Sequence, residues 1–146
     1  MTLVMFWQFF FVLTLIGSAS YALTMGGWPE RTGAIITVLA TVLTVIANMT
    51  LAPKWHSIDR GALMVDILVL ASFVNLSLLC DRFWPIWAAS FQIPIVAIDF
   101  APALTEVSGA ALSNAQVFWV YPTFLSLIIG TRAHQLRQRE RAAGQS

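Results

Sequence analysis

The chain has 146 residues, of which 58% are apolar and only 10% are charged. A soluble domain carries about 25% charged residues, so this composition excludes an ordinary water-exposed surface and indicates a chain solvated mostly by lipid. The eight basic and seven acidic residues are also unevenly spread, because five of them lie within residues 132–146.

Long charge-poor runs divide the rest of the chain into candidate helices. About 20 helical residues cross a hydrocarbon core of roughly 30 Å, so each run can supply one crossing. The sequence therefore predicts an all-α polytopic transmembrane bundle over residues 1–131 and a basic tail over 132–146. The five expected spans cover about 3–25, 33–51, 61–80, 85–102 and 112–131.

The first two spans differ in what their polar residues indicate. No Lys or Arg precedes the first apolar stretch, which is also longer than the core of a usual signal peptide, so we expect a permanent helix here and no cleaved leader. The second span carries small and hydroxyl side chains at spacings of three and four, which predict a face for close helix packing. These residues are Gly33, Thr37, Ala40, Thr41, Thr44, Ala47 and Asn48.

Asp66 places a carboxyl group inside the third span. A charged side chain costs roughly 2.5–3.5 kcal/mol at the centre of a membrane helix and less near its end, so it should face a partner or a water-filled cavity. Asn48 is the expected partner, because it lies about as far before the loop at 52–60 as Asp66 lies after it.

The fourth span is the least regular, because Pro94 interrupts it and Asp99 shortens its apolar stretch. An alternative topology has four spans, with residues 85–110 re-entrant or lying in the membrane interface. Gln92 and Asp99 are seven residues apart and so share one helix face, and Gln116 of the fifth span is expected at a similar depth. We therefore predict an intramembrane polar cluster towards the outer side. Its members are Asn48, Asp66, Gln92, Asp99 and Gln116.

Two interpretations of this cluster stay open at the level of sequence. Its side chains could hold the helices together by hydrogen bonds, or they could form a site for a solute, an ion or a proton.

The tail after the fifth span holds four of the eight Lys and Arg residues, which places it in the cytoplasm by the positive-inside rule. Five spans then put the N-terminus in the periplasm. The tail is expected to determine topology, although its basic residues could also recognise anionic lipid, and it is too short to indicate nucleic-acid binding. These residues are Arg132, Arg137, Arg139 and Arg141.

Four of the six tryptophans lie at the ends of predicted helices. Tryptophan is enriched at both membrane interfaces, so these residues are expected to anchor the helices there. They are Trp28, Trp55, Trp84 and Trp87.

The chemistry of a catalytic or cofactor site is missing from the pattern. Neither His56 nor His134 lies inside a span, and no His, Cys and carboxylate group has the spacing of a metal site. No phosphate-binding loop or nucleophile motif can be assembled. We therefore expect no enzyme activity, no cofactor and no bound metal.

Three segments carry a resemblance to a known group: "GGWPERTGA" (26–34), "DRFWPIWAASFQ" (81–92) and "FWVYPTFLSLIIGT" (118–131). Together they resemble a group of small integral membrane proteins of alphaproteobacteria that has no established activity. The resemblance implies a bacterial inner-membrane location. Relatives often carry a histidine a few residues after the glutamine that matches Gln92, whereas "IPIVAID" has none, which argues against a ligand role for this helix.

Two functions from different classes follow as expectations. The first is a non-catalytic accessory or structural subunit, whose apolar faces contact the lipid bilayer and either other membrane proteins or a second copy of the chain. The second is a small transporter or channel component that uses the polar cluster.

Overall fold

The computed structural model describes residues 2–50, 60–104 and 109–144. Within its helices, the side chains of residues 2–5, 48, 102–104, 109–114 and 117 are outside the description. The described residues form an all-α bundle without a strand, which confirms the predicted fold class. The helices are α1 (Thr2–Met25), α2 (Trp28–Thr50), α3 (Arg60–Leu79), α4 (Trp84–Leu104) and α5 (Gly109–Ala143).

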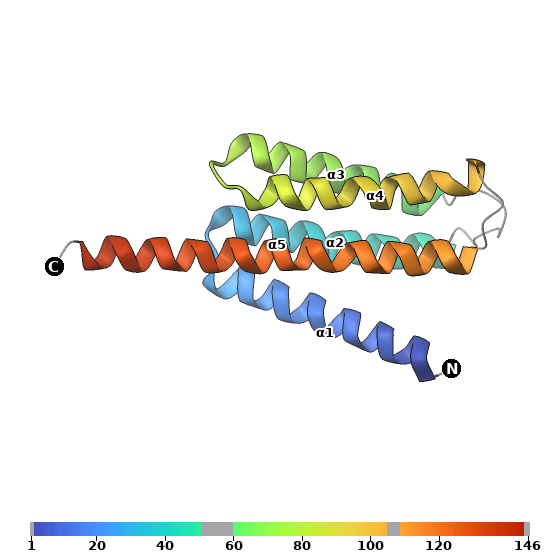
Figure 1. The fold of residues 1–146 in the computed structure, drawn as a ribbon, viewed down its shortest axis with the longest axis horizontal. Coiled ribbons are helices and arrows are strands. Elements are labelled where there is room, and N and C mark those ends of the chain that lie inside the picture. The colour runs from blue at the N-terminus through green and yellow to red at the C-terminus, as the bar shows by residue number, and fades with distance from the viewer. Residues whose placement is uncertain (1, 51–59, 105–108, 145–146) are drawn as a thin grey trace.

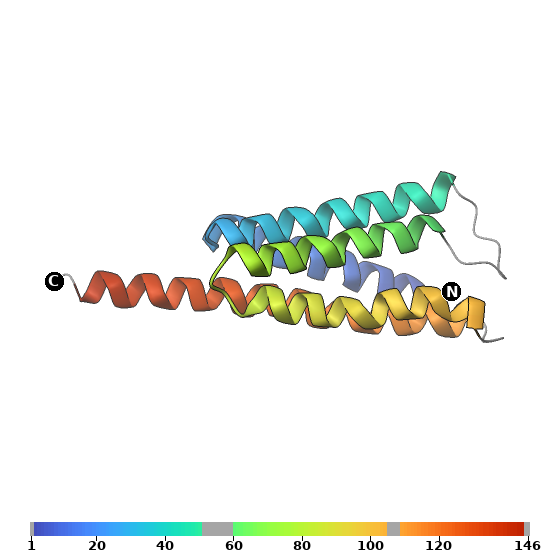
Figure 2. The same cartoon turned by 90° about the horizontal axis from the view of Figure 1, so that it is seen from above.

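Consecutive helices run antiparallel and lie side by side, and α5 closes the arrangement by packing on α1 (Figures 1 and 2). The helices α2 and α5 also contact each other, across the inside of the bundle. Because the number of helices is odd, the two termini lie at opposite ends of the bundle (Figure 1). The end at which α1 and α3 finish is called here the basic end, and the end at which α3 and α5 begin is called the acidic end.

Four of the five helices are long and apolar enough to cross a membrane. They include α4, which packs on both α3 and α5. Residues 84–104 therefore form a full-length helix of the bundle and are not a re-entrant segment. The helix α5 runs alongside the other four (Figure 1), and its crossing of the membrane stays a prediction. The candidate spans are Phe6–Met25, Trp28–Ala47, Arg60–Leu79 and Trp84–Ala101.

The C-terminal tail, for which no secondary structure was predicted from the sequence, continues α5 as regular helix up to Ala143. Its sequence explains this, since Ala, Leu, Gln, Glu and Arg are all good helix formers. The helix ends at Gly144, whose N–H donates to the Glu140 carbonyl at 3.0 Å. With 35 residues, α5 is about 50 Å long, so its last turns project beyond the basic end (Figure 1).

The helix α2 begins five residues earlier than predicted, at Trp28. The Glu30 side chain accepts a hydrogen bond from the Gly27 N–H at 2.9 Å, as the third residue of a helix does in a capping box. Pro29 is tolerated because the first turn needs no backbone donor from it. The sequence "GWPE" is therefore a helix start, and only Gly26 and Gly27 separate α1 from α2.

The core is rich in small side chains near the basic end, and α1, α2 and α4 each contribute to it. Ala22, Ala34 and Ala88 are each fully buried. Small residues allow membrane helices to pack backbone against backbone, which is where dispersion contacts are most numerous. Ala34 lies beside the packing face predicted for α2 and is not one of its residues; of that face, Gly33 is buried and Thr37, Ala40 and Thr41 are half-buried. Thr37 and Thr41, however, donate to carbonyls of their own helix, at 2.8 and 3.0 Å.

Candidate functional site

Polar side chains gather at both ends of the bundle, and those of the acidic end come from three helices. Asp66 lies in the second turn of α3 and accepts a hydrogen bond at Oδ1 from Gln92 Nε2 of α4, at 3.2 Å. Gln92 is buried, and Asp66 is half-buried. The amide thereby satisfies a carboxyl group that would otherwise destabilise the spans.

A second pair of the same type joins α4 to α5. The amide of Gln116 donates to Oδ1 of Asp99, which is buried. The carboxyl groups of Asp66 and Asp99 also interact with each other. The structure therefore brings four of the five predicted cluster residues together, as two hydrogen-bonded pairs, across α3, α4 and α5.

Asn48, the fifth predicted member, is in α2, but its side chain is outside the described part of the chain. The predicted pairing of Asp66 with Asn48 therefore stays a prediction. The hydrogen bond that the structure shows for Asp66 comes from Gln92. Sequence reasoning placed Gln92 in the cluster through the face it shares with Asp99, and it had no means to match that face to α3.

Trp84 corrects the predicted set of interfacial anchors, because it is only 5% exposed. A Cβ added at Gly33 of α2 or at Gly130 of α5 would lie 2.3 Å from its ring. The ring of Phe73 in α3 packs against it edge-on, with centroids 6.2 Å apart. Trp84 therefore holds four helices together at the basic end. A tryptophan at a helix end can be buried when neighbouring helices offer glycine.

Of the other three predicted anchors, two lie in the part of the chain that the structure describes. Trp28 and Trp87 are exposed by 57% and 56% respectively, at the ends of α2 and α4. Such positions fit the predicted contact with the membrane interface. Trp55 lies outside the described residues.

Glu30 is fully buried beside Trp84, with no solvent exposure. Its Oε1 accepts from the Trp84 indole N–H at 3.1 Å, and its Oε2 accepts from the Gly27 N–H at 2.9 Å. Burying a carboxyl group is unfavourable unless it is hydrogen-bonded, and here both oxygens have a donor. Sequence reasoning missed this residue. Glycine followed three residues later by glutamate, just before an apolar run, is the signal that could have found it.

His134 of α5 reaches the same region from the projecting part of the helix. Its Nδ1 accepts a hydrogen bond from Arg82 Nη2 at 3.0 Å. A Cβ at Gly27 would come within 2.9 Å of the imidazole Cε1, so the ring lies against the α1–α2 connection. At the next residue of α5, Gln135, the side chain accepts a hydrogen bond from Tyr21 at 3.0 Å, which ties α1 to α5. The extension of α5 is thus fastened to the bundle.

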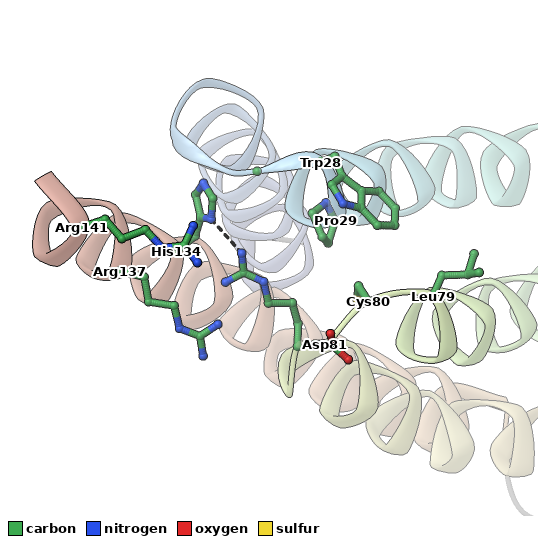
Figure 3. A pocket seen from close by; sticks show the side chains of 10 residues that line it. Trp28, Pro29, Leu79, Cys80, Asp81, His134, Arg137 and Arg141 are labelled. Carbon is green, nitrogen blue, oxygen red and sulfur yellow. Dashed lines mark hydrogen bonds between the residues drawn. The ribbon is translucent and has the colours of Figure 1, made fainter.

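A cavity of about 390 Å³ opens between the start of α2, the turn that joins α3 to α4, and α5. Arg82, Arg137 and Arg141 gather around His134 on this side of the bundle (Figure 3). Of the four tail arginines, the structure places Arg137 and Arg141 along the cavity, while Arg132 and Arg139 are exposed elsewhere on α5. The cavity is lined by Gly27, Trp28, Pro29, Leu79, Cys80, Asp81, Arg82, His134, Arg137 and Arg141.

Cys80 lies at the end of α3, at the edge of this cavity. Its thiol donates to the Leu76 carbonyl at 2.9 Å, and burial raises the pKa of the Cys80 thiol. A thiol held protonated is a poor nucleophile and metal ligand. Among the described residues, no group of three or more His, Cys, Asp or Glu side chains is arranged to hold a metal ion.

The class of protein follows from this architecture: an all-α bundle with four helices able to cross a bilayer is a multi-pass membrane protein. Comparison with protein-family models, curated proteins and solved structures found no match. The resemblance to the alphaproteobacterial group therefore stays an expectation.

Proposed function

We propose that this protein is a non-catalytic accessory subunit of a larger complex in the bacterial inner membrane. The observation that carries the proposal is the pairing of intramembrane carboxyl groups with amides of the same chain, Asp66 with Gln92 and Asp99 with Gln116. Polar groups used in this way lock neighbouring helices in position.

The outer surface supports a role in contact with lipid and other membrane proteins. Along α1 and α2 the outward side chains are large and apolar, and many are about half exposed. Without a hydrophobic driving force between helices in lipid, association depends on shape and on locally matched contacts. A bundle whose intramembrane carboxyl groups Asp66 and Asp99 are paired with amides of the same chain can present such a surface without adding a charge to it.

Gentle detergent extraction of the tagged full-length chain from native membranes, followed by mass spectrometry, tests the proposal. We expect a second membrane protein to co-purify in a fixed ratio and to survive exchange between two mild detergents. A tagged multi-pass protein of similar size, extracted in parallel, controls for non-specific recovery. Recovery of the chain only as an isolated monomer would contradict the proposal.

A small transporter or channel component is the second candidate, and the interaction between the carboxyl groups of Asp66 and Asp99 favours it. Carboxyl side chains that face each other between spanning helices are a feature of proton relays in membrane proteins.

Flux measurements on the reconstituted protein test this second candidate. Purified protein in vesicles that contain a pH-sensitive dye should dissipate a pH gradient if the pair conducts protons. Asp66→Asn should abolish that flux, while Asp81→Asn, the same change at an exposed turn residue, should preserve it. Flux that is equal in both variants would exclude the carboxyl pair as a pathway.

A further inference from the structure

The basic-end cavity has the composition of a site for an anionic group. Three arginines line it against one carboxylate, Asp81, so its lining has an excess of positive charge even when His134 is neutral. Glu30 lies behind Gly27, and both of its oxygens are already hydrogen-bonded. Even when Glu30 is counted with Asp81, the three arginines leave an excess of positive charge around the cavity.

Arg82 adds an unused donor to this lining. Its Nη2 is held by His134, whereas its Nη1 is buried and has no hydrogen-bond partner among the described residues. A buried donor without a partner is unfavourable, and a guanidinium group presents its N–H donors in the fork that suits carboxylate and phosphate oxygens. Because Arg82 itself lines the cavity, a small rotation of its guanidinium group would bring this donor to an anion bound there.

The position of the cavity indicates where the anion would come from. Three candidate spans end or begin here, at Trp28, Leu79 and Trp84, so in a bilayer the cavity lies where hydrocarbon gives way to headgroups. The apolar side chains beside it are exposed, with Leu79 at 66% and Phe83 at 77%. Acyl chains would lie against these residues when a headgroup occupies the cavity.

We propose that this cavity binds the phosphate group of an anionic phospholipid, with Arg82, Arg137 and Arg141 as the phosphate-binding residues. His134 holds Arg82 in position through its Nδ1. Basic pockets between membrane helices bind anionic headgroups by the same combination of charge and hydrogen bonding. The extension of α5 then has a function beyond topology, because it carries two of the three arginines to the cavity.

The helical phase of α5 supplies a matched control. Arg137 and Arg141 share the face of His134, whereas Arg132 and Arg139 lie on nearly the opposite face at about 100° per residue. A double change of Arg137 and Arg141 to Gln therefore removes the same charge from the tail as a double change of Arg132 and Arg139. Only the first pair lines the cavity.

Native mass spectrometry of the full-length protein in detergent tests the proposal, with phosphatidylglycerol and phosphatidylcholine of identical acyl chains as probes. The wild type should bind phosphatidylglycerol in preference. The Arg137/Arg141 variant should bind it about 30-fold more weakly, from roughly fivefold for each basic residue at an anionic surface. The Arg132/Arg139 variant should stay within about twofold of the wild type, and all three should melt at the same temperature.

A second arm of the experiment separates the two sources of phosphate. Inorganic phosphate is titrated into lipid-stripped protein while its melting temperature is followed. Stabilisation that needs the intact headgroup and acyl chains supports the lipid, and stabilisation by inorganic phosphate alone supports the same site with a soluble ligand. Equal weakening of phosphatidylglycerol binding in the two double variants, or no preference over phosphatidylcholine in the wild type, would overturn the proposal.

Discussion

The two ends of the bundle bury carboxyl groups in different ways. At the basic end, Glu30 is fully buried and is held by a backbone N–H and by an indole fixed between helices. At the acidic end, Asp66 is only half-buried, and its donor is the amide of Gln92, a side chain with several rotatable bonds. The first arrangement depends on packing that cannot rearrange without moving helices, whereas the second can exchange partners locally.

This difference indicates that the two ends of the bundle are stabilised by different kinds of contact. Trp84, Gly33 and Gly130 make the basic end a packed junction of α2, α4 and α5. Dense packing around such a junction makes it sensitive to changes of a single methyl group. The acidic end joins α3, α4 and α5 through polar pairs. Hydrogen bonds of this kind contribute less to the free energy of unfolding of a membrane protein than the dense packing at the basic end. Substitutions at the two ends should therefore differ in their effect on unfolding.

Trp84→Ala should produce the largest loss, since it removes a buried ring and leaves the Glu30 carboxyl without its indole donor. We expect the free energy of unfolding to fall by about 3–5 kcal/mol, measured by denaturant titration in detergent micelles. Trp87→Ala, at an exposed tryptophan three residues away, should change it by less than about 1 kcal/mol. Equal effects of the two changes would contradict the buried junction.

Glu30→Leu should produce the next largest loss. It leaves the Gly27 N–H and the Trp84 N–H buried without an acceptor, and each such donor costs about 1–3 kcal/mol. Glu30→Gln keeps one side-chain oxygen and should lose about half as much in the same titration. If Glu30→Leu stabilised the bundle, the hydrogen bonds of Glu30 would not be needed for the junction.

Gly130→Ala should destabilise the bundle by about 1–3 kcal/mol through overpacking. Its Cβ would meet Trp84 Cδ1 at 2.3 Å, and Gly33 lies against the far end of the same indole, at its six-membered ring. Gly17→Ala is the matched control, because nothing lies within 4 Å of a Cβ there. It should leave stability unchanged or raise it by up to about 1 kcal/mol. Thermal melting of the two purified variants checks this difference. Equal melting temperatures for Gly130→Ala and Gly17→Ala would contradict the close packing of Trp84 against Gly130.

The pairing of Asp66 with Gln92 should produce the smallest effect. A double-mutant cycle of Asp66→Ala and Gln92→Ala should give a coupling free energy of about 0.6 kcal/mol, and at most about 1.7 kcal/mol, as is typical of hydrogen bonds between membrane helices. Denaturant titration of the wild type, the two single variants and the double variant gives this quantity. A coupling free energy larger than the loss of unfolding free energy caused by Trp84→Ala would reverse the ranking of the two ends.

Much of the fold could be predicted from the sequence because lipid imposes a simple rule on each segment separately. Charge-poor runs of about 20 residues located all five helices, and the ends of α1, α3 and α4 agree with the expected ones to within two residues. The start of α2 was missed because Glu30 was interpreted as a loop residue, although its capping role depends only on nearby residues.

The candidate sites were less predictable, because each depends on which helix faces are in contact. Asp66, Gln92, Asp99 and Gln116 could be selected one by one, since a polar residue inside a span needs a partner wherever it points. Their actual pairing, Asp66 with Gln92 and Asp99 with Gln116, required the arrangement of α3, α4 and α5. The burial of Trp84 required Gly33 and Gly130, which lie far from it along the chain.

The sequence by itself therefore determined the class of fold and the residues that are costly in lipid, because these properties depend on local composition and length. Only the tertiary structure decided that Trp84 is a core residue, that Glu30 is buried and that Arg82, His134, Arg137 and Arg141 surround one cavity. The physical reason is that burial and pairing depend on contacts between helices. The sequence of a helix sets which side chains it presents, but it does not by itself set which neighbour those side chains meet.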